Sequence, residues 1–332
     1  MLPLSIQFIS VFLASLVLTY LYRQYAIHKA ILDLPNLRSS HLIPTPRGGG
    51  LAIAITLYSG FVLLFVNGHI NHALFMALLC GIPISIIGFI DDLKGLRPIV
   101  RSLVQFGCAI LALYFLGGLN YLDLGFVVIR WTWLLTILAV FGIIWSINLF
   151  NFLDGTDGYI GTEIVFVGSS FCLLTMDLSP LIMAISVLGF LIWNWPKAKI
   201  FMGDVGSTLL GFIVAIMVIY YQNERQVSII VSLILTSVFW FDATVTLFRR
   251  LINKEKLNEA HRKHAYQRIV QAGYSHQKTV LWALAINFAG FGLAWLAMKF
   301  EGWNWLFLLI DLTMLLFVLR FIDKKKAFEY QK

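Results

Sequence analysis

Apolar runs separated by short polar stretches extend along the whole chain. A helix needs about 20 mostly apolar residues to cross the hydrocarbon core of a bilayer. By that measure we predict eleven transmembrane helices, at approximately residues 3–22, 50–66, 72–90, 102–116, 131–149, 160–176, 181–195, 205–221, 227–248, 279–298 and 303–321. The pattern predicts an all-α fold: a polytopic integral membrane protein whose residues 1–332 form one transmembrane domain.

The composition agrees with a protein built for a bilayer. Of the 332 residues, 59% are hydrophobic and 13% are charged, whereas soluble domains carry about 25% charged residues. This excludes an ordinary soluble enzyme. The 27 Phe, 12 Tyr and 10 Trp residues also exclude a disordered chain, because such chains are poor in aromatic residues.

The basic residues are distributed unequally between alternate loops. Of the 25 Lys and Arg residues, 22 fall in one set of loops and in the C-terminal tail, and only Arg130, Arg225 and Lys299 fall in the other set. Because cytoplasmic loops carry the excess of Lys and Arg, we predict that the N-terminus is outside and the C-terminus inside. The net charge of +8 then reflects orientation in the membrane, with no nucleic acid as partner. The inner loops, about 23–49, 91–101, 150–160, 194–207 and 249–278, are expected to carry the chemistry at the cytoplasmic surface.

Five carboxylates follow the inner ends of three predicted spans: Asp91, Asp92, Asp154, Asp157 and Asp204. Repulsion among neighbouring carboxylates raises their pKa values unless a cation neutralises them. Oxygen ligands without clustered Cys or His favour Mg²⁺, or Mn²⁺, over zinc. We therefore predict a divalent metal site at this surface. The alternative is that the acids only solvate helix ends.

Asn and Asp recur at steps of three after the fifth predicted span. The series is Asn148, Asn151, Asp154 and Asp157, and on a continuing helix these side chains would share one face. A glycine follows each aspartate and allows close backbone approach or a positive φ. Such a turn suits a nucleotide and its metal ion.

A basic loop precedes the tenth predicted span. It contains His261, Arg262, His264 and Arg268 at or near helical spacings. The guanidinium group matches the geometry of phosphate oxygens, and imidazole can donate to a phosphate or move a proton. We predict phosphate binding here. A solvated positive loop is the alternative, and a zinc site lacks a third nearby ligand.

A segment rich in proline and glycine, residues 39–50, precedes the second predicted span. Its prolines prevent regular helix, and the glycine run after Arg47 can turn backbone amides toward an anion. The segment lacks the Gly-x4-Gly-Lys-Ser/Thr pattern of a P-loop. Anion binding and a flexible linker are the two interpretations.

Taken in order, five motifs resemble those of the polyprenyl-phosphate N-acetylhexosamine-1-phosphate transferases. They are Pro-Thr-Pro-Arg-Gly-Gly-Gly, Gly-Phe-Ile-Asp-Asp, Asn-x-x-Asn-x-x-Asp-Gly-x-Asp-Gly, Phe-Met-Gly-Asp-x-Gly-Ser and the His/Arg loop, and they span about residues 38–270. The resemblance implies Mg²⁺-dependent transfer of a sugar phosphate from a UDP-N-acetylhexosamine to undecaprenyl phosphate, with release of UMP. It also implies a bacterial inner-membrane enzyme, active on the cytoplasmic face, that initiates O-antigen or another cell-envelope polysaccharide.

The resemblance also implies roles for single residues. It implies that Asp204 and Asp92 bind the metal and that Asp91, with Asp92, lies beside the lipid phosphate. The nucleotide side would comprise Asn148, Asn151, Asp154, Asp157, Asn194 near uracil and Phe201 stacked on the base. Phosphate contacts are implied for Arg47, His261, Arg262, His264 and Arg268. A membrane-interface anchor is the alternative for Phe201.

The sequence departs from the family pattern in three places. Many relatives have His-x-His-His in the basic loop, whereas here Ala265, Tyr266 and Gln267 follow His264. This form resembles the branch that starts O-antigen with N-acetylfucosamine or N-acetylquinovosamine. Lys94 is one residue closer to the acids than in the muramoyl enzyme, and the eleventh span departs from that enzyme's ten-span plan. The sugar, a homodimer, and direct or covalent transfer are left open.

A transporter with an intramembrane acidic ion site is the alternative from another class. It would need carboxylates near the middle of the membrane, where the sequence offers Asp242 and Asp311. Asp242 lies about two helical turns from the predicted inner face and could also belong to the surroundings of the active site.

Overall fold

The computed structural model describes residues 3–35, 43–257 and 261–329. Residues 39–42 of the proline- and glycine-rich segment and residues 258–260 of the basic loop lie outside the described residues. The described chain is mostly helical, as predicted. Its helices are α1 (Leu4–His28), α2 (Gly50–Val66), α3 (His72–Leu79), α4 (Ile82–Lys94), α5 (Pro98–Leu116), α6 (Thr132–Leu153), α7 (Tyr159–Thr175), α8 (Ser179–Asn194), α9 (Asp204–Asn223), α10 (Ile229–Leu235), α11 (Ser237–Ile252), α12 (Ala265–Gln271), α13 (His276–Lys299), the 3₁₀ turn η1 (Glu301–Trp303) and α14 (Asn304–Lys325).

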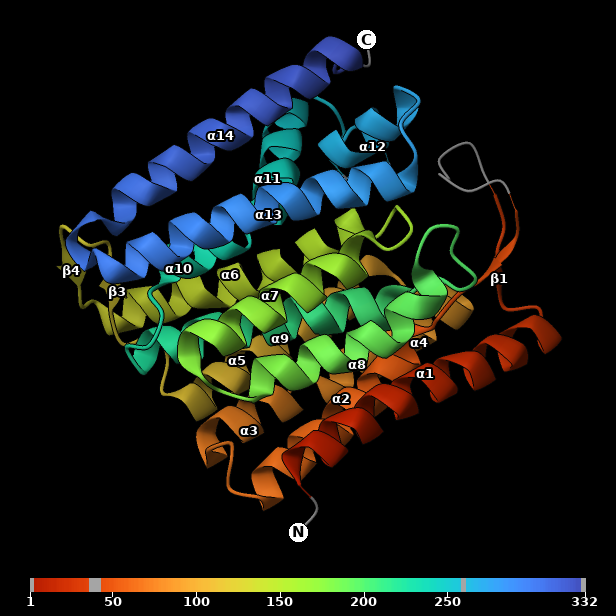
Figure 1. Ribbon diagram of the computed structural model, residues 1–332, viewed down its shortest axis with the longest axis horizontal. Helices are drawn as coiled ribbons and strands as arrows, with labels where there is room; N and C mark the ends of the chain where they lie inside the picture. The colour runs from red at the N-terminus through yellow and green to blue at the C-terminus, as the bar shows by residue number, and fades with distance from the viewer. Residues whose placement is uncertain (1–2, 36–42, 258–260, 330–332) are drawn as a thin grey trace.

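Two short antiparallel ribbons accompany the helices. Strand β1 (Leu32–Asp33) pairs with β2 (Thr45–Pro46), and β3 (Leu122–Asp123) pairs with β4 (Val128–Ile129). The long helices form a bundle, with β1 and α12 at one end and β3 and β4 at the other (Figure 1). The end that carries β1 and α12 is called the site end below.

Each of the eleven predicted apolar runs is helical in the structure. Within the described residues, seven helical segments are long and apolar enough to cross a membrane, with α3 and α4 counted as one, and the bent pair α10–α11 gives up to eight. Helices α2, α7 and α8 are apolar but have only 17, 17 and 16 residues. The chain is thus a membrane protein, whereas eleven crossings with the N-terminus outside remain a prediction.

The predicted continuous span at residues 227–248 is wrong. The chain bends by 84° between α10 and α11, at Thr236. The bend frees backbone carbonyls, and side chains bond to some of the carbonyls near it: Trp240 Nε1 donates to the Leu233 carbonyl at 2.8 Å and Thr236 Oγ1 to the Ser232 carbonyl at 2.9 Å. No proline or glycine marks this position, so hydropathy alone predicted an unbroken helix.

Helix α9 lies at the centre of the bundle, and 89% of its most apolar 18-residue stretch is buried. It packs against α2, α4 and α6. Small residues let the backbones approach: a Cβ on Gly50 of α2 would collide with the backbone of Gly206, and one on Gly88 of α4 would lie 2.8 Å from the Val205 Cα. This close packing brings the last turn of α4 and the first turn of α2 against the start of α9.

The two ends of the bundle differ in charge. Arg130 and Arg225 line one cavity beside β3 and β4, together with Met298 near the end of α13. Lys299 follows Met298 directly. The three basic residues that sequence analysis assigned to one face thus share the end opposite the site end.

Candidate active site

The turn between α4 and α5 positions Asp91. Helix α4 ends at Lys94 and is followed by Gly95, which has φ +66°. Pro98 begins α5 after an extended Arg97. A glycine after one helix and a proline at the start of the next are expected at such a turn. Asp91 accepts hydrogen bonds from the Leu96 amide at 2.5 Å and from Arg101 Nη1 at 2.6 Å. Its carboxylate is therefore held toward the first turn of α5.

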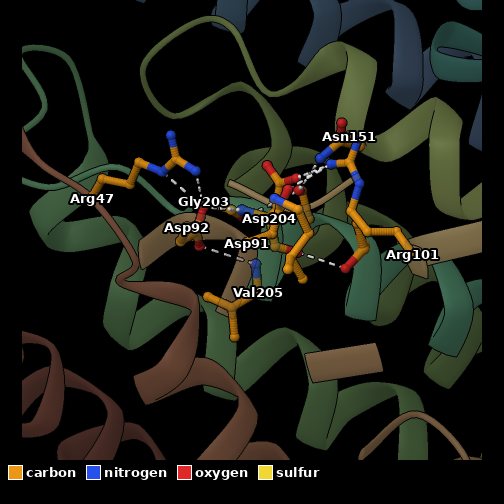
Figure 2. A network of polar contacts seen from close by, with 11 residues as sticks. Arg47, Asp91, Asp92, Arg101, Asn151, Gly203, Asp204 and Val205 are labelled. Atoms are coloured by element: carbon orange, nitrogen blue, oxygen red, sulfur yellow. Dashed lines mark hydrogen bonds and ion pairs between the residues drawn. The ribbon is translucent and has the colours of Figure 1, made fainter. Parts of the chain in front are cut away.

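Asp92 caps the N-terminus of α9. Its carboxylate accepts hydrogen bonds from the amides of Asp204 at 3.0 Å and Val205 at 3.3 Å, and Arg47 Nη2 lies 2.6 Å from its Oδ1 (Figure 2). A helix N-terminus favours such a negative charge. The Asp92 side chain is 1% exposed. Its surroundings are thus already filled by protein donors.

Asp204 lies at the first position of α9 and faces Asp91. Arg101 Nη1 is 2.6 Å from an Asp91 oxygen and 2.8 Å from an Asp204 oxygen (Figure 2). Asn151 reaches the same place from α6 and donates to Ser207 Oγ at 3.4 Å. The predicted approach of three distant motifs is thus observed. Arg101 Nη1 thus contacts one carboxylate oxygen from α4 and one from α9.

The donor set fits Mg²⁺ in the form this ion takes beside phosphates. Mg²⁺ is usually bound by one or two carboxylates together with substrate phosphate oxygens and water. Among the described residues, no group of three or more His, Cys, Asp or Glu side chains is arranged to hold a metal. Asp91 and Asp204 converge on one point, whereas four donor atoms surround Asp92. The geometry favours Asp91 over the predicted Asp92 as the partner of Asp204.

The Asn and Asp series does not continue on one helix face, because the helix ends within it and the glycine-containing turn follows. Helix α6 ends at Leu153, so that Asn148 and Asn151 are helical while Asp154 and Asp157 follow in a turn. Burial, with Asp204 and Asp92 nearby, raises the pKa of Asp154 to about 7. Asp157 points elsewhere: it accepts from the Ala198 amide at 3.1 Å and lies 3.2 Å from His276 Nδ1.

Asn194 is the last residue of α8, and Phe201 lies in the segment between α8 and α9. Asn194 is 6% exposed. Its Oδ1 accepts from the Gly158 amide at 2.9 Å, and its Nδ2 donates to the Ile200 carbonyl at 2.9 Å. The backbone of Phe201 bonds to Pro46 and Gly49, at 2.8 and 2.9 Å. Asn194 thus connects the turn that contains Asp157 to the segment between α8 and α9. Phe201 connects the same segment to the residues on either side of Arg47.

The basic loop folds as α12 and is held by Asp242. The Asp242 carboxylate accepts from the amides of Ala265 at 2.7 Å and Tyr266 at 3.2 Å, and it lies 3.6 Å from His264 Nδ1. Tyr266 also donates to the Phe152 carbonyl at 3.3 Å, beside the Asp154 turn. The basic loop is therefore attached to the end of α6, next to the carboxylates.

His261 lies next to His264, with ring centroids 4.9 Å apart. Burial, together with the Coulomb effects of His264, Arg250 and Lys263, lowers the pKa of His261 to about 3. Its imidazole is therefore neutral near pH 7, and its Nδ1 accepts from the Lys263 amide at 3.3 Å.

The structure does not bring Arg268 to the carboxylates. Its side chain is 3% exposed, and Nη1 lies 2.5 Å from Asp323 Oδ1 on α14. Arg262 precedes α12 and lines a pocket with Lys263 and Arg268. The predicted phosphate contacts of Arg262 and Arg268 stay predictions. Arg47 contacts Asp92 and Asn151 contacts Ser207 beside Asp204, whereas the carboxylate neighbour of His264 is Asp242.

Sequence reasoning missed three residues at the site. Arg101, treated only as a loop charge, bridges Asp91 and Asp204; its place one turn after the helix-starting Pro98 could have indicated it. Tyr266 links α12 to α6, and it stood out only as a departure from the family motif. His276 contacts Asp157, and no sequence signal marked it.

Carboxylates paired with arginines lie at the same end of the bundle as the loop that carries His261 and His264, and such an arrangement suits phosphoryl chemistry. The family model described as glycosyl transferase family 4 matches residues 74–222. A probable undecaprenyl-phosphate N-acetylglucosaminyl 1-phosphate transferase of Bacillus subtilis (strain 168) is 30% identical and covers 96% of this chain and 91% of its own length. The undecaprenyl-phosphate alpha-N-acetylglucosaminyl 1-phosphate transferases of Escherichia coli (strain K12) and Yersinia pestis are each 28% identical, covering 86% of this chain and 82% of their own lengths.

The chain therefore belongs to glycosyl transferase family 4, and it is an enzyme, a glycosyl-1-phosphate transferase. This confirms the family resemblance found in the motifs and favours the transferase over the transporter. Asp242, one of the two acids that a transporter would use, instead holds the amides of α12.

Proposed function

We propose that this enzyme transfers an N-acetylhexosamine 1-phosphate from a UDP-sugar to undecaprenyl phosphate, with Mg²⁺, and releases UMP. N-acetylglucosamine is the first candidate sugar, because the relatives are named for it. The observation that best supports this proposal is that Arg101 Nη1 contacts a carboxylate oxygen of both Asp91 and Asp204. Such a site suits a reaction in which two phosphate-bearing substrates must approach each other.

The acceptor lipid has a matching surface beside this site. An apolar cavity of about 320 Å³ lies between α6, α9, α10 and α11, and its lining reaches Leu149 and Phe150. These residues directly precede Asn151 at the end of α6. A polyprenyl chain in this cavity would place its phosphate next to the carboxylates, and we expect this arrangement at the cytoplasmic face of the bacterial inner membrane, where positive loops gather.

In the proposed reaction, an oxygen of the lipid phosphate attacks the phosphorus that carries the sugar. The bond from that phosphorus to the bridging oxygen breaks, and this oxygen leaves with UMP. The second pKa of a phosphate monoester is about 6, so that little base catalysis is required near pH 7. Positioning and charge neutralisation carry most of the rate.

The chain's own residues would divide this work. Arg47 and Arg101 are about one-third exposed and can turn from the carboxylates to phosphate oxygens, to which the guanidinium group is matched. His264, fixed by Asp242, would donate to a phosphate. Asp91 and Asp204 would hold Mg²⁺, which when bound supplies positive charge to the diphosphate. Asp92 would keep α9 and Arg47 in place.

A donor panel tests this proposal directly. Purified protein with undecaprenyl phosphate and Mg²⁺ is incubated with UDP-N-acetylglucosamine and with the UDP forms of N-acetylgalactosamine, N-acetylfucosamine and N-acetylquinovosamine. UMP and a lipid-linked sugar diphosphate should form together with at least one donor. The preferred donor then separates an O-antigen type of starting sugar from N-acetylglucosamine. Absence of both products with every donor would refute the proposal.

Removal of the metal is expected to stop the reaction. With EDTA in excess, UMP release should fall to background, because the diphosphate and the carboxylates then repel each other without neutralisation. Mg²⁺ or Mn²⁺ should restore it, since both suit oxygen ligands. UMP is quantified after each addition. Full turnover in EDTA would show that the arginines alone suffice.

A further inference from the structure

Helix α12 has only seven residues, and isolated helices of this length are not stable in water. Its position therefore depends on contacts at both of its ends. At the N-terminal end, Asp242 of α11 accepts the first amides. At the C-terminal end, Arg268 connects α12 to the last helix of the chain.

Asp323 of α14 pairs with two arginines from different helices. Arg268 Nη1 lies 2.5 Å from Asp323 Oδ1 and also donates to the Lys326 carbonyl at 2.9 Å. Arg249 of α11 donates through both terminal nitrogens, at 2.9 and 2.8 Å. Such paired contacts fix orientation as well as distance. One carboxylate thus ties α11, α12 and α14 together.

Phe328, just beyond α14, adds a second contact. Its side chain is buried, at 7% exposure, and three cations lie over its ring: Arg249 at 5.3 Å, Lys263 at 5.6 Å and Arg268 at 5.5 Å. Cations at this distance are attracted by the aromatic face. Lys263 directly precedes His264, so the contact reaches the residue next to the imidazole.

We propose that the Asp323 cluster, defined as Arg249, Lys263, Arg268, Asp323 and Phe328, positions His264 for phosphate transfer, with Asp323 as the positioning residue. The proposal rests on the proposed function. The proposal gives a function to α14 and the C-terminal tail, which correspond to the eleventh predicted span and the residues after it. Asp242 fixes the start of α12. The Asp323 cluster fixes the last turn of α12 through Arg268 and also contains Lys263, which precedes His264. His264 therefore lies between Lys263 and the amides that Asp242 binds.

Asp323→Asn tests the proposal in the full-length protein. It keeps the shape of the side chain and removes the charge that pairs with Arg249 and Arg268. Amides in residues 265–271 should exchange hydrogen faster, because α12 loses an attachment. The value of kcat/KM for the UDP-sugar should fall by about tenfold or more, as expected when a positioning contact is lost. Asp323→Glu should recover most of this loss, since it restores the charge.

Lys324→Gln is the matched control, because Lys324 is an exposed neighbour on the same helix turn and should leave both measurements unchanged. Unchanged exchange in Asp323→Asn would overturn the proposal, and so would faster exchange with wild-type kcat/KM. An activity loss that Asp323→Glu does not recover, accompanied by a lower thermal midpoint, would show a purely structural role and also overturn it. A wild-type protein that is inert with every donor would instead refute the proposed function. The hydrogen-exchange experiment would then test only whether Asp323 holds α12 in place.

Discussion

Alanine in place of Asp204 is expected to abolish transfer. Asp204 supplies one of the two carboxylate oxygens that meet at Arg101 Nη1, and its first-turn position on α9 aims it at Asp91. Without it, the proposed Mg²⁺ site would keep only the Asp91 carboxylate, and the proposed diphosphate substrate would lose a fixed position. We expect UMP release to fall by about 10³-fold or more, the size seen when a principal electrostatic contact to the transition state is removed. Quantification of UMP at saturating Mg²⁺ measures the effect.

Two comparisons make this result specific. Asp123→Asn replaces a carboxylate of the β3–β4 ribbon at the opposite end of the bundle. Asp123 Oδ1 accepts a hydrogen bond from the Gly125 amide at 2.8 Å, and the amide oxygen of asparagine can accept the same bond. This variant should retain activity. Raising the Mg²⁺ concentration should not rescue Asp204→Ala if positioning as well as affinity is lost. Turnover of Asp204→Ala within tenfold of wild type would refute the role of Asp204.

The convergence of Asp91, Asp92 and Asp204 could be predicted from the sequence because each follows an apolar run. Hydropathy assigns the ends of such runs to a face, and residues at the same face of one bundle are brought near each other. What hydropathy does not give is rotation and pairing. Asp157 satisfies the same rule, yet its carboxylate turns to Ala198 and His276. The direction of a side chain in a turn depends on the neighbouring chain, which spacing does not show.

The sequence also does not show which acidic residues from distant segments pair with the basic loop. The helical spacing of His264 and Arg268 indicated one phosphate-binding face. In the structure the Asp242 carboxylate accepts hydrogen bonds from the first amides of α12, and Asp323 pairs with Arg268. Asp242 lies within the apolar run 227–248, 23 residues before Ala265, and Asp323 lies just after the run 303–321, 55 residues beyond Arg268. A basic side chain predicted to bind a substrate anion can equally be neutralised by a buried acid of the protein, and only the fold decides between them.

The fold itself was predicted well where the hydrophobic signal is continuous. All eleven apolar runs are helical, since each backbone group in a bilayer needs an internal hydrogen bond. The bend at Thr236 was missed because its broken hydrogen bonds are replaced by side chains such as Trp240. This bend carries consequences for the site: it directs α11 so that Asp242 reaches α12. A local departure from regular helix thus positions a residue that the catalytic loop requires.

Gly203→Ala is expected to disable the site although it replaces none of the side chains assigned to the chemistry. Gly203 has φ +77° directly before α9, a conformation that L side chains rarely adopt. A Cβ at this position would also collide with Asp92 Oδ2. Asp92 would have to move away from the α9 amides, and Asp204 and Arg47 would shift with it. We expect UMP release to fall by about 100-fold or more, because displacements of about 1 Å in a catalytic arrangement cost this much.

Gly68→Ala separates the two causes of this loss. Gly68 has a similar φ of +74°, but no heavy atom lies within 4 Å of the position that its Cβ would take. It should therefore show only the strain of a left-handed backbone, about 1–2 kcal/mol of stability, with transfer activity near wild type. Thermal midpoints of the two variants in detergent, measured beside UMP release, distinguish strain from collision. If Gly203→Ala and Gly68→Ala behave alike in both measurements, the collision with Asp92 has no catalytic consequence and Asp92 does not set the geometry of the site.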